Sequence, residues 1–143
     1  MGVIIVGVDG TEPAAQAALT AARLAAALGS ELRVVCGYGK FEVEQVADDQ
    51  ELNVSTAESA VIVGEQAVRR LKAVYPEVNA TVQASGGKPA DALLAVAEQV
   101  DAELIVVGNK RVQGASRILG SIATELARKT QCDLYVAYTH ARK

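Results

Sequence analysis

The segment from Gly108 to Ser121 combines residue types that bind phosphate. It follows an apolar run, ends in Gly120-Ser121 and leads directly into a stretch with helical spacing. Glycine lets the backbone approach a ligand closely, and the unpaired N–H groups of a first helical turn, here those of Ser121, Ile122 and Ala123, attract anions. The loop also holds three cations, Lys110, Arg111 and Arg117, and no acid. This combination indicates a site for a phosphate-bearing ligand.

The same residues also have a plainer interpretation, in which a solvated basic loop precedes an ordinary helix start. Ser121 would then cap the helix with its hydroxyl instead of giving it to a phosphate oxygen. Asp9 is ambiguous in the same way. Its carboxylate could hold a ribose hydroxyl or a divalent cation, but an aspartate beside Gly10 is also a common turn-former. Local features leave both alternatives open.

Alternating strands and helices must position these residues. Apolar runs typical of strands occur at 3–8, 32–36, 103–107 and 133–138, with a weaker alternating run at 78–82. Helical patterns lie between them, at 14–28, 57–71, 89–97 and 121–129, and an irregular acid-rich loop is expected at 37–52. Right-handed crossovers turn this alternation into a parallel sheet. We expect one α/β domain over residues 1–143, a doubly wound five-stranded sheet of order 3-2-1-4-5 with helices on both faces.

The expected fold gives the loop a functional place. A doubly wound sheet binds ligands outside the carboxyl ends of its strands, where the chain order reverses. The two most apolar strands, 3–8 and 104–107, should be central, so the turns at Asp9-Gly10 and Gly108 should face each other. The phosphate loop begins at one of these turns, which favours the ligand interpretation.

Composition narrows the class of protein. The N-terminus has no basic region, and no run approaches the roughly 18 apolar residues of a membrane span, so we expect a cytoplasmic protein without membrane contact. A net charge of −3 argues against nucleic-acid binding. The charge is uneven, because residues 108–143 hold seven bases and only two acids, Glu125 and Asp133. Cys36 and Cys132 lie in or beside apolar runs and are expected to be reduced and buried.

Four pieces of the chain, taken together, resemble the universal stress protein family in order and spacing. They are residues 4–12, 87–93, 102–108 and 119–121, and the resemblance covers essentially the whole chain, although residues 37–54 and the helix after them match only in kind. One branch of that family binds ATP or related adenine nucleotides through Gly-x2-Gly-x9-Gly-Ser/Thr. Here Arg111 replaces the second glycine, and eight residues separate it from Gly120. Gly114 could restore flexibility three residues later.

The resemblance implies a nucleotide site around this loop. Asp9 would contact the ribose or a Mg²⁺ ion, the backbone near Cys36 and Gly37 would read the adenine edge, and Val107 with Gly108 would flank the nucleoside. Gly120 and the three residues after it would hold the phosphates. The full implied contact set is Val8, Asp9, Gly10, Cys36, Gly37, Val107, Gly108, Lys110, Arg111, Gly114, Arg117, Gly120, Ser121, Ile122 and Ala123.

Arg111 leaves two alternatives open. Its side chain could intrude on the phosphates, as expected of a branch that does not bind nucleotide, or its guanidinium could bind them bidentately. We favour binding, because the terminal Gly-Ser and three cations would otherwise have little purpose. Family members also commonly dimerise through their last strands. Residues 134–138 contain no proline or lysine to protect an edge, so we expect a homodimer there, the alternative being a monomer whose tail covers that edge.

Three enzyme classes fit poorly. A dinucleotide-dependent oxidoreductase needs G-x-G-x-x-G after the first strand, where this chain has Gly7-Val8-Asp9-Gly10-Thr11, and a phosphoacceptor receiver needs more acids than Asp9. For a hydrolase, His140 is the only histidine and no Ser–His or carboxylate pair is visible. We expect a stress-response protein, not an enzyme, that binds ATP or AMP as a regulatory ligand. A nucleotide-free stress or interaction module and a slow ATPase, using Glu12 or Asp9 with a metal, are the alternatives.

Overall fold

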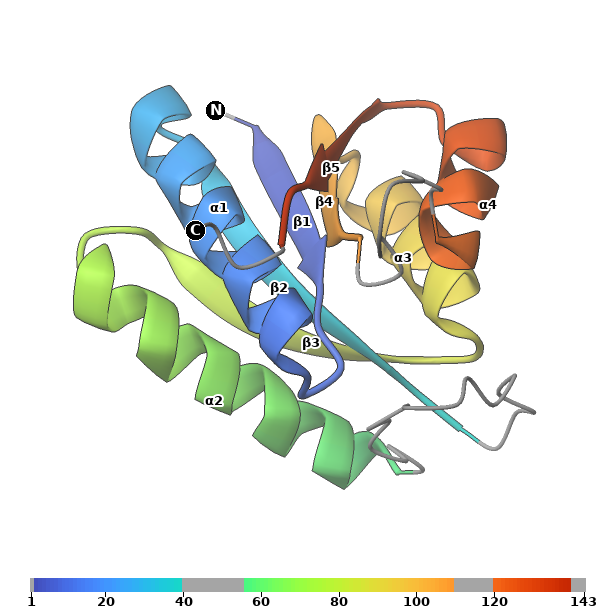
Figure 1. Ribbon diagram of the computed structural model, residues 1–143, viewed down its shortest axis with the longest axis horizontal. Helices are drawn as coiled ribbons and strands as arrows, with labels where there is room; N and C mark the ends of the chain where they lie inside the picture. Colours follow the sequence, from blue (N-terminus) through green and yellow to red (C-terminus); the bar gives the residue numbers. More distant parts are fainter. Residues whose placement is uncertain (1, 40–55, 110–119, 140–143) are drawn as a thin grey trace.

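Strands and helices alternate along the chain. The computed structural model describes residues 2–39, 56–109 and 120–139. The elements are β1 (Val3–Gly7), α1 (Glu12–Leu28), β2 (Glu31–Tyr38), α2 (Ala57–Val74), β3 (Ala80–Gly86), α3 (Pro89–Val100), β4 (Leu104–Gly108), α4 (Ser121–Lys129) and β5 (Asp133–Ala137). Figure 1 shows α1 and α2 on one side of the sheet and α3 and α4 on the other.

The five strands form one sheet of order β3-β2-β1-β4-β5, in which every pair is parallel. This confirms the expected doubly wound α/β fold and its strand order. β1 lies at the centre and pairs with β2 and β4, while β3 and β5 form the two edges. The weak strand expected near an edge is therefore an edge strand.

Burial on both faces explains why the central strands are apolar without alternation. Ile4 and Val6 of β1 lie in the core under α1 and α2, whereas Ile5 lies in the core under α3 and α4. All three are fully buried, as is Ile105 in the neighbouring β4. A sheet covered on both faces selects such continuous apolar runs.

Helix α1 packs closely on the sheet because its inner face is made of alanine. Five alanines are buried there, namely Ala17, Ala18, Ala21, Ala22 and Ala25. Thr11 is the N-cap and its hydroxyl accepts from the N–H of Ala14, while Gly29 ends the helix with a φ of 67°. The helix predicted at 14–28 is confirmed, and glycine suits its end because only glycine adopts this left-handed conformation without strain.

The predicted bounds of β2 and β3 were wrong, and these errors share a cause. β2 continues to Tyr38, into the segment expected to be loop, and β3 runs from Ala80 to Gly86 instead of 78–82. The two strands pair from Leu32 with Ala80 to Tyr38 with Gly86, so each extends the other. Backbone pairing, which local hydrophobicity does not report, set these boundaries.

Smaller differences concern helix lengths and one cysteine. α2 continues to Val74 and α3 to Val100, both beyond their predicted ends. Cys36 is buried as expected, but Cys132 is only partly buried, because it lies just before the edge strand β5. Among the helices in the described part of the chain, none is long and apolar enough to cross a membrane.

Candidate functional site

The carboxyl ends of β1 and β4 lie side by side, as the sequence predicted. The two strands pair in parallel with Val6 opposite Val106. Beyond them, a Cβ atom built on Gly108 would lie 3.1 Å from the carbonyl oxygen of Pro13 in the first turn of α1. The end of β4 therefore touches the start of α1, and a side chain at position 108 would fit only if this contact shifted slightly.

Asp9 shapes the turn that follows β1. Its Oδ1 accepts hydrogen bonds from the backbone N–H of Thr11 at 3.0 Å and from the Thr11 hydroxyl at 2.6 Å. The same hydroxyl accepts from the N–H of Ala14, so Asp9 orients the cap of α1. Gly10 between them has a φ of 88°, a conformation that favours glycine. The turn-forming role of Asp9 is real, and its carboxylate is held at the carboxyl edge of the sheet.

The end of β2 lies beside this turn. The Val8 N–H donates to the Val35 carbonyl at 2.9 Å, which continues the pairing of β1 with β2 past the last residue of β1. Burial, and after it charge repulsion from the Asp9 carboxylate, together raise the pKa of the Cys36 thiol to about 11. Asp9 and Cys36 are thus close enough to interact electrostatically.

Gly37 lies where β2 meets the start of α3. A Cβ atom at this position would lie 3.3 Å from the Gly87 carbonyl oxygen and 3.4 Å from Cβ of Ala92. The Gly87 N–H in turn donates to the Tyr38 carbonyl at 2.9 Å. Glycine at position 37 lets the α3 start approach the backbone of β2 closely.

The start of α4 differs in one respect from the sequence interpretation. Gly120 is the N-cap residue and Ser121 is the first helical residue, so the Ser121 hydroxyl does not cap the helix. The first intrahelical hydrogen bond runs from the Thr124 N–H to the Gly120 carbonyl at 3.0 Å. The N–H groups of Ser121, Ile122 and Ala123 precede that bond and point out of the helix end. The first turn contains no acid, so the helix dipole there favours an anion.

Asn109 caps this helix from outside it. Its Oδ1 accepts from the Gly120 N–H at 3.1 Å, across eleven positions of sequence. Asn109 is only 9% exposed, although it follows directly after β4. Asn109 is not among the site residues predicted from the sequence. The available signal was an amide side chain immediately after a strand-ending glycine, where such side chains often bond to backbone.

The described site residues surround the carboxyl ends of β1, β2 and β4 and the start of α4. Val8, Cys36, Val107 and Ala123 are buried in the two cores, so they could meet a ligand only through their backbone. Asp9 is partly buried, whereas the Ser121 side chain is exposed. The other predicted contacts, Lys110, Arg111, Gly114 and Arg117, lie outside the described residues.

A metal site made by protein side chains alone finds no support in the described ranges. Within residues 2–39, 56–109 and 120–139, no group of three or more His, Cys, Asp or Glu side chains could hold an ion. Asp9 offers a single carboxylate, so a cation there would need further oxygen ligands.

Comparisons of the sequence and of the structure with known proteins all point to one family. The model of the universal stress protein family matches residues 1–137. Universal stress protein Rv1636 of Mycobacterium tuberculosis (strain ATCC 25618 / H37Rv) is 26% identical over 144 residues, covering 95% of each chain. A solved universal stress protein in complex with cAMP is 26% identical, covers 97% of this chain and 98% of its own, and has a TM-score of 0.75.

A second solved structure supports the fold alone. The universal stress protein of Archaeoglobus fulgidus in complex with dAMP is 21% identical, with 95% of this chain and 97% of that chain covered and a TM-score of 0.64. The parallel sheet and its four helices thus agree with known members of one family.

Proposed function

Because this chain belongs to the universal stress protein family, we propose that it is a stress-response protein that binds an adenine nucleotide, ATP or AMP, as a regulatory ligand. The observation that carries the proposal is the start of α4, where three backbone N–H groups and an exposed hydroxyl precede the first intrahelical hydrogen bond. A similar family protein forms a complex with cAMP, which supports an adenine nucleotide over other phosphate ligands.

The phosphates would lie at this helix start. The N–H groups of Ser121, Ile122 and Ala123 supply donors, and the helix dipole adds a partial positive charge. Gly120 has no side chain to obstruct the approach. The sequence adds three cations nearby in the chain, Lys110, Arg111 and Arg117, which would neutralise the phosphate charge.

The nucleoside would extend from there toward β1 and β2. Asp9 is already oriented by Thr11, so its carboxylate could accept from a ribose hydroxyl without first being ordered. The backbone at Cys36 and Gly37 would read the adenine edge, and Val107 and Gly108 would flank the ring. Where ATP carries Mg²⁺, the Asp9 carboxylate would join the phosphate oxygens as a ligand of the ion.

The ligand is proposed to regulate and not to turn over rapidly. Among the residues that the structure describes, the proposed binding groups are backbone donors, the Ser121 hydroxyl and the Asp9 carboxylate, and these would position a nucleotide without supplying a general acid–base pair. A nucleotide-free stress or interaction module of the same family remains the second candidate, and a slow ATPase using Asp9 or Glu12 with a metal the third. We place the protein in the cytoplasm, in line with the features of its sequence.

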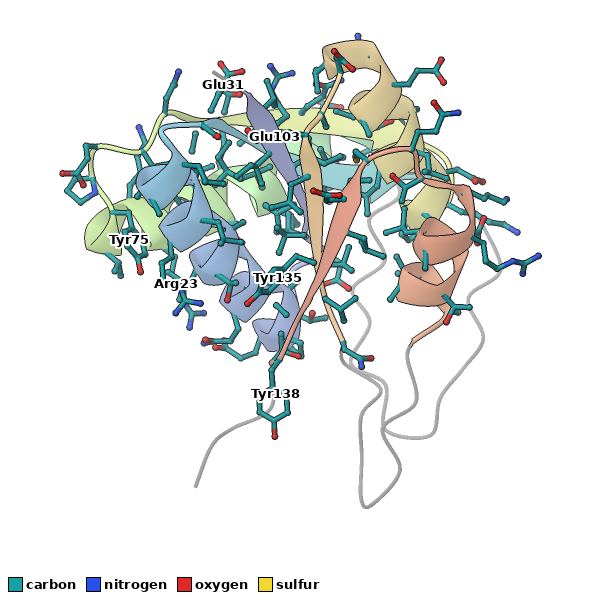
Figure 2. All side chains as sticks on the ribbon, turned by 90° about the horizontal axis from the view of Figure 1, so that it is seen from above. Arg23, Glu31, Tyr75, Glu103, Tyr135 and Tyr138 are labelled. Atoms are coloured by element: carbon teal, nitrogen blue, oxygen red, sulfur yellow. The ribbon has the colours of Figure 1, made fainter. Side chains whose placement is uncertain are left out.

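We further propose a homodimer formed through the edge of β5. This strand is last in the sheet order and pairs with β4. Tyr135 is 38% exposed and Tyr138 is 52% exposed, and Figure 2 shows Tyr138 pointing away from the sheet beyond the end of the strand. An exposed edge with aromatic side chains favours pairing with a second copy.

Calorimetry with ATP, AMP and cAMP, each with and without Mg²⁺, tests the nucleotide proposal. We expect heat from at least one of these ligands, and no heat from any of them at millimolar concentration would overturn it. Release of inorganic phosphate from ATP, measured in parallel, distinguishes a regulatory ligand from a slow substrate.

Arg111 needs its own variant because two roles are open to it. We propose that its guanidinium contacts the phosphates, so Arg111→Gly should weaken binding of ATP. Tighter binding by the variant would mean that the wild-type side chain obstructs the ligand. Lys143→Gly is the control, because it also removes one positive charge but lies at the end of the chain and outside α4.

A further inference from the structure

We infer that Asn109 is the positioning residue for the ligand's phosphate group, because its carboxamide fixes the N-terminus of α4 against the end of β4. The inference rests on the proposed function and goes beyond it, since it assigns the orientation of the anion-binding N–H groups to a residue that need not touch the ligand. The juxtaposition that carries it is the hydrogen bond from the Gly120 N–H to the Asn109 Oδ1.

Asn109 is well anchored for this task. It follows β4 directly, and three consecutive residues of that strand, Ile105, Val106 and Val107, are at most 4% exposed. Asn109 itself is 9% exposed, so its carboxamide is largely shielded from water. A hydrogen bond that is shielded in this way is not readily exchanged for one to solvent.

The hydrogen bond also selects which donors a ligand meets. A helix start offers four N–H groups without intrahelical partners, which in α4 are those of Gly120 and the three residues after it. Asn109 occupies the Gly120 N–H, so the anion is directed to the three that follow, those of Ser121, Ile122 and Ala123. Because the acceptor is a neutral amide, it holds the backbone without placing a negative charge beside the phosphate.

This contact accounts for how the chain could keep a phosphate site despite its unusual loop. Arg111 and the shortened spacing make the beginning of the loop unlike the family pattern, whereas Gly120-Ser121 matches it. Asn109 and Gly120 lie on either side of residues 110–119. A hydrogen bond between them sets the start of α4 relative to the β4 core, whatever the sequence of the connection.

Two variants separate this role from a contribution to stability alone. Asn109→Ala removes the acceptor, and Asn109→Asp keeps an acceptor oxygen but places a carboxylate beside the anion. NMR titrations of each variant and wild type with AMP and with adenosine give the preference for the phosphate-bearing ligand. We expect both variants to lose about tenfold in affinity for AMP, the upper end of the scale for one neutral hydrogen bond, while affinity for adenosine changes less than about twofold.

Thr130→Ala is the matched control. The Thr130 hydroxyl accepts from the Cys132 N–H at 3.2 Å, at the opposite end of the same helix. This variant also loses one side-chain acceptor for a backbone N–H, so it should lower the melting temperature without changing the preference for AMP over adenosine. A fall in that preference equal to the fall in Asn109→Ala would assign the effect to helix stability and overturn the inference.

The remaining outcomes are distinguishable. If wild type prefers AMP over adenosine and both Asn109 variants keep that preference, the role of Asn109 is overturned while the proposed function stands. If wild type binds adenosine and AMP equally, the phosphate site is overturned but a nucleoside site stands. If wild type binds neither, the proposed function itself is overturned, and the positioning role with it.

Discussion

Arg70 of α2 forms a bidentate ion pair with Glu12 of α1. Its two terminal nitrogens donate to the two carboxylate oxygens at 2.9 and 2.7 Å. Glu12 is the first residue of α1, three positions after Asp9, so the pair ties α2 to the helix start that borders the candidate site. The hydrogen bonds from Arg70 and then from Gln16 lower the pKa of Glu12 from 4.5 to about 2.

Glu12→Gln should therefore reduce stability in a pH-dependent way. Because the folded-state pKa is depressed, the stabilisation is fully present above pH 4.5 and is lost as the pH falls through about 2. The Glu12 and Arg70 side chains are 62% and 45% exposed, so solvent screens the pair and the loss at pH 7 should stay below about 1 kcal/mol. Urea unfolding of wild type and variant at pH 7, 5 and 3 measures the difference.

Glu58→Gln is the control for this prediction, because Glu58 is also an exposed acid in the first turn of a helix. The difference in free energy of unfolding between wild type and Glu12→Gln should narrow from pH 5 to pH 3. The corresponding difference for Glu58→Gln should narrow less. A gap of the same size at all three pH values would show that the ion pair does not govern the titration of Glu12.

Cys36 should react with thiol reagents far more slowly than Cys132. The Cys36 side chain is 1% exposed, and burial with the nearby Asp9 charge raises its pKa to about 11, whereas Cys132 is partly exposed. Only the thiolate attacks a disulfide reagent. With Ellman's reagent at pH 8 we expect one fast thiol and a second released only by unfolding, and Cys132→Ser should abolish the fast phase.

The same pKa shift makes stability fall at alkaline pH. A raised folded-state pKa stabilises the protein below the ordinary value of 9.0, and this contribution is lost as the pH rises through about 11. Unfolding measured from pH 8 to 11 should show a smaller decline for Cys36→Ala than for wild type. Equal declines would contradict the assignment, because other alkaline titrations are common to both proteins.

Gly64 should not tolerate alanine, although it lies in the middle of α2. A Cβ at this position would overlap Cγ1 of Val82 on β3, and a β-branched side chain has little freedom to move away. Gly64→Ala should destabilise by about 1–3 kcal/mol, as overpacking does, against the usual gain of about 0.5–1 kcal/mol for this change within a helix. Chemical unfolding measures the sign directly.

A double-mutant cycle isolates the contact between Gly64 and Val82. In the Val82→Ala background, the methyl groups that oppose the new Cβ are gone, so Gly64→Ala should be far less destabilising there than in wild type. Equal effects in both backgrounds would mean that the overlap is relieved elsewhere.

More of the fold than of the site could be predicted from the sequence, because the residue patterns that mark strands and helices lie within short segments. Continuous apolar runs marked β1 and β4 as central, and helical spacing over 14–28 marked α1. The β3 boundaries could not be read in this way, since its pairing with β2 set them. Its residues are mostly small or polar, and they carry a weak hydrophobic signal.

The candidate site likewise contains residues that could be recognised from the sequence and residues that could not. Gly120 and Ser121 were recognisable as a helix start from their own residue types. Asn109 was not, because its role depends on a hydrogen bond to a residue eleven positions away. The Glu12–Arg70 pair spans 58 positions and depends on α1 and α2 lying side by side on one face of the sheet. Such tertiary contacts have no periodic signature in a single sequence.

Tyr135→Lys should convert the proposed homodimer into a monomer. Tyr135 is the exposed aromatic residue in the middle of β5 (Figure 2), and a lysine on an edge strand opposes pairing with another copy. Sedimentation equilibrium should give a dimer for wild type and a monomer for the variant. Leu28→Lys, at the exposed end of α1, is the control and should remain a dimer. A monomeric wild-type protein at micromolar concentration would contradict the dimer proposal.

Gly120→Val should abolish nucleotide binding while leaving the fold intact. Gly120 has φ −66° and ψ 165°, an extended conformation that residues with side chains also adopt. The backbone therefore has no need of glycine here, and the effect of valine should come from a side chain that keeps the phosphates away from the N–H groups of α4. We expect loss of the heat of AMP binding in calorimetry, with an unchanged circular dichroism spectrum.

Gly29→Ala gives the opposite pattern and is the control for Gly120→Val. Gly29 has φ 67° with open space around it, so alanine there is strained by roughly 1 kcal/mol without a steric clash. It should lower the melting temperature and leave AMP binding unchanged, since it ends α1 on the far side from Thr11 and Asp9. If Gly120→Val binds AMP like wild type, the phosphate does not lie against the start of α4, and the ligand must be sought elsewhere on the molecule.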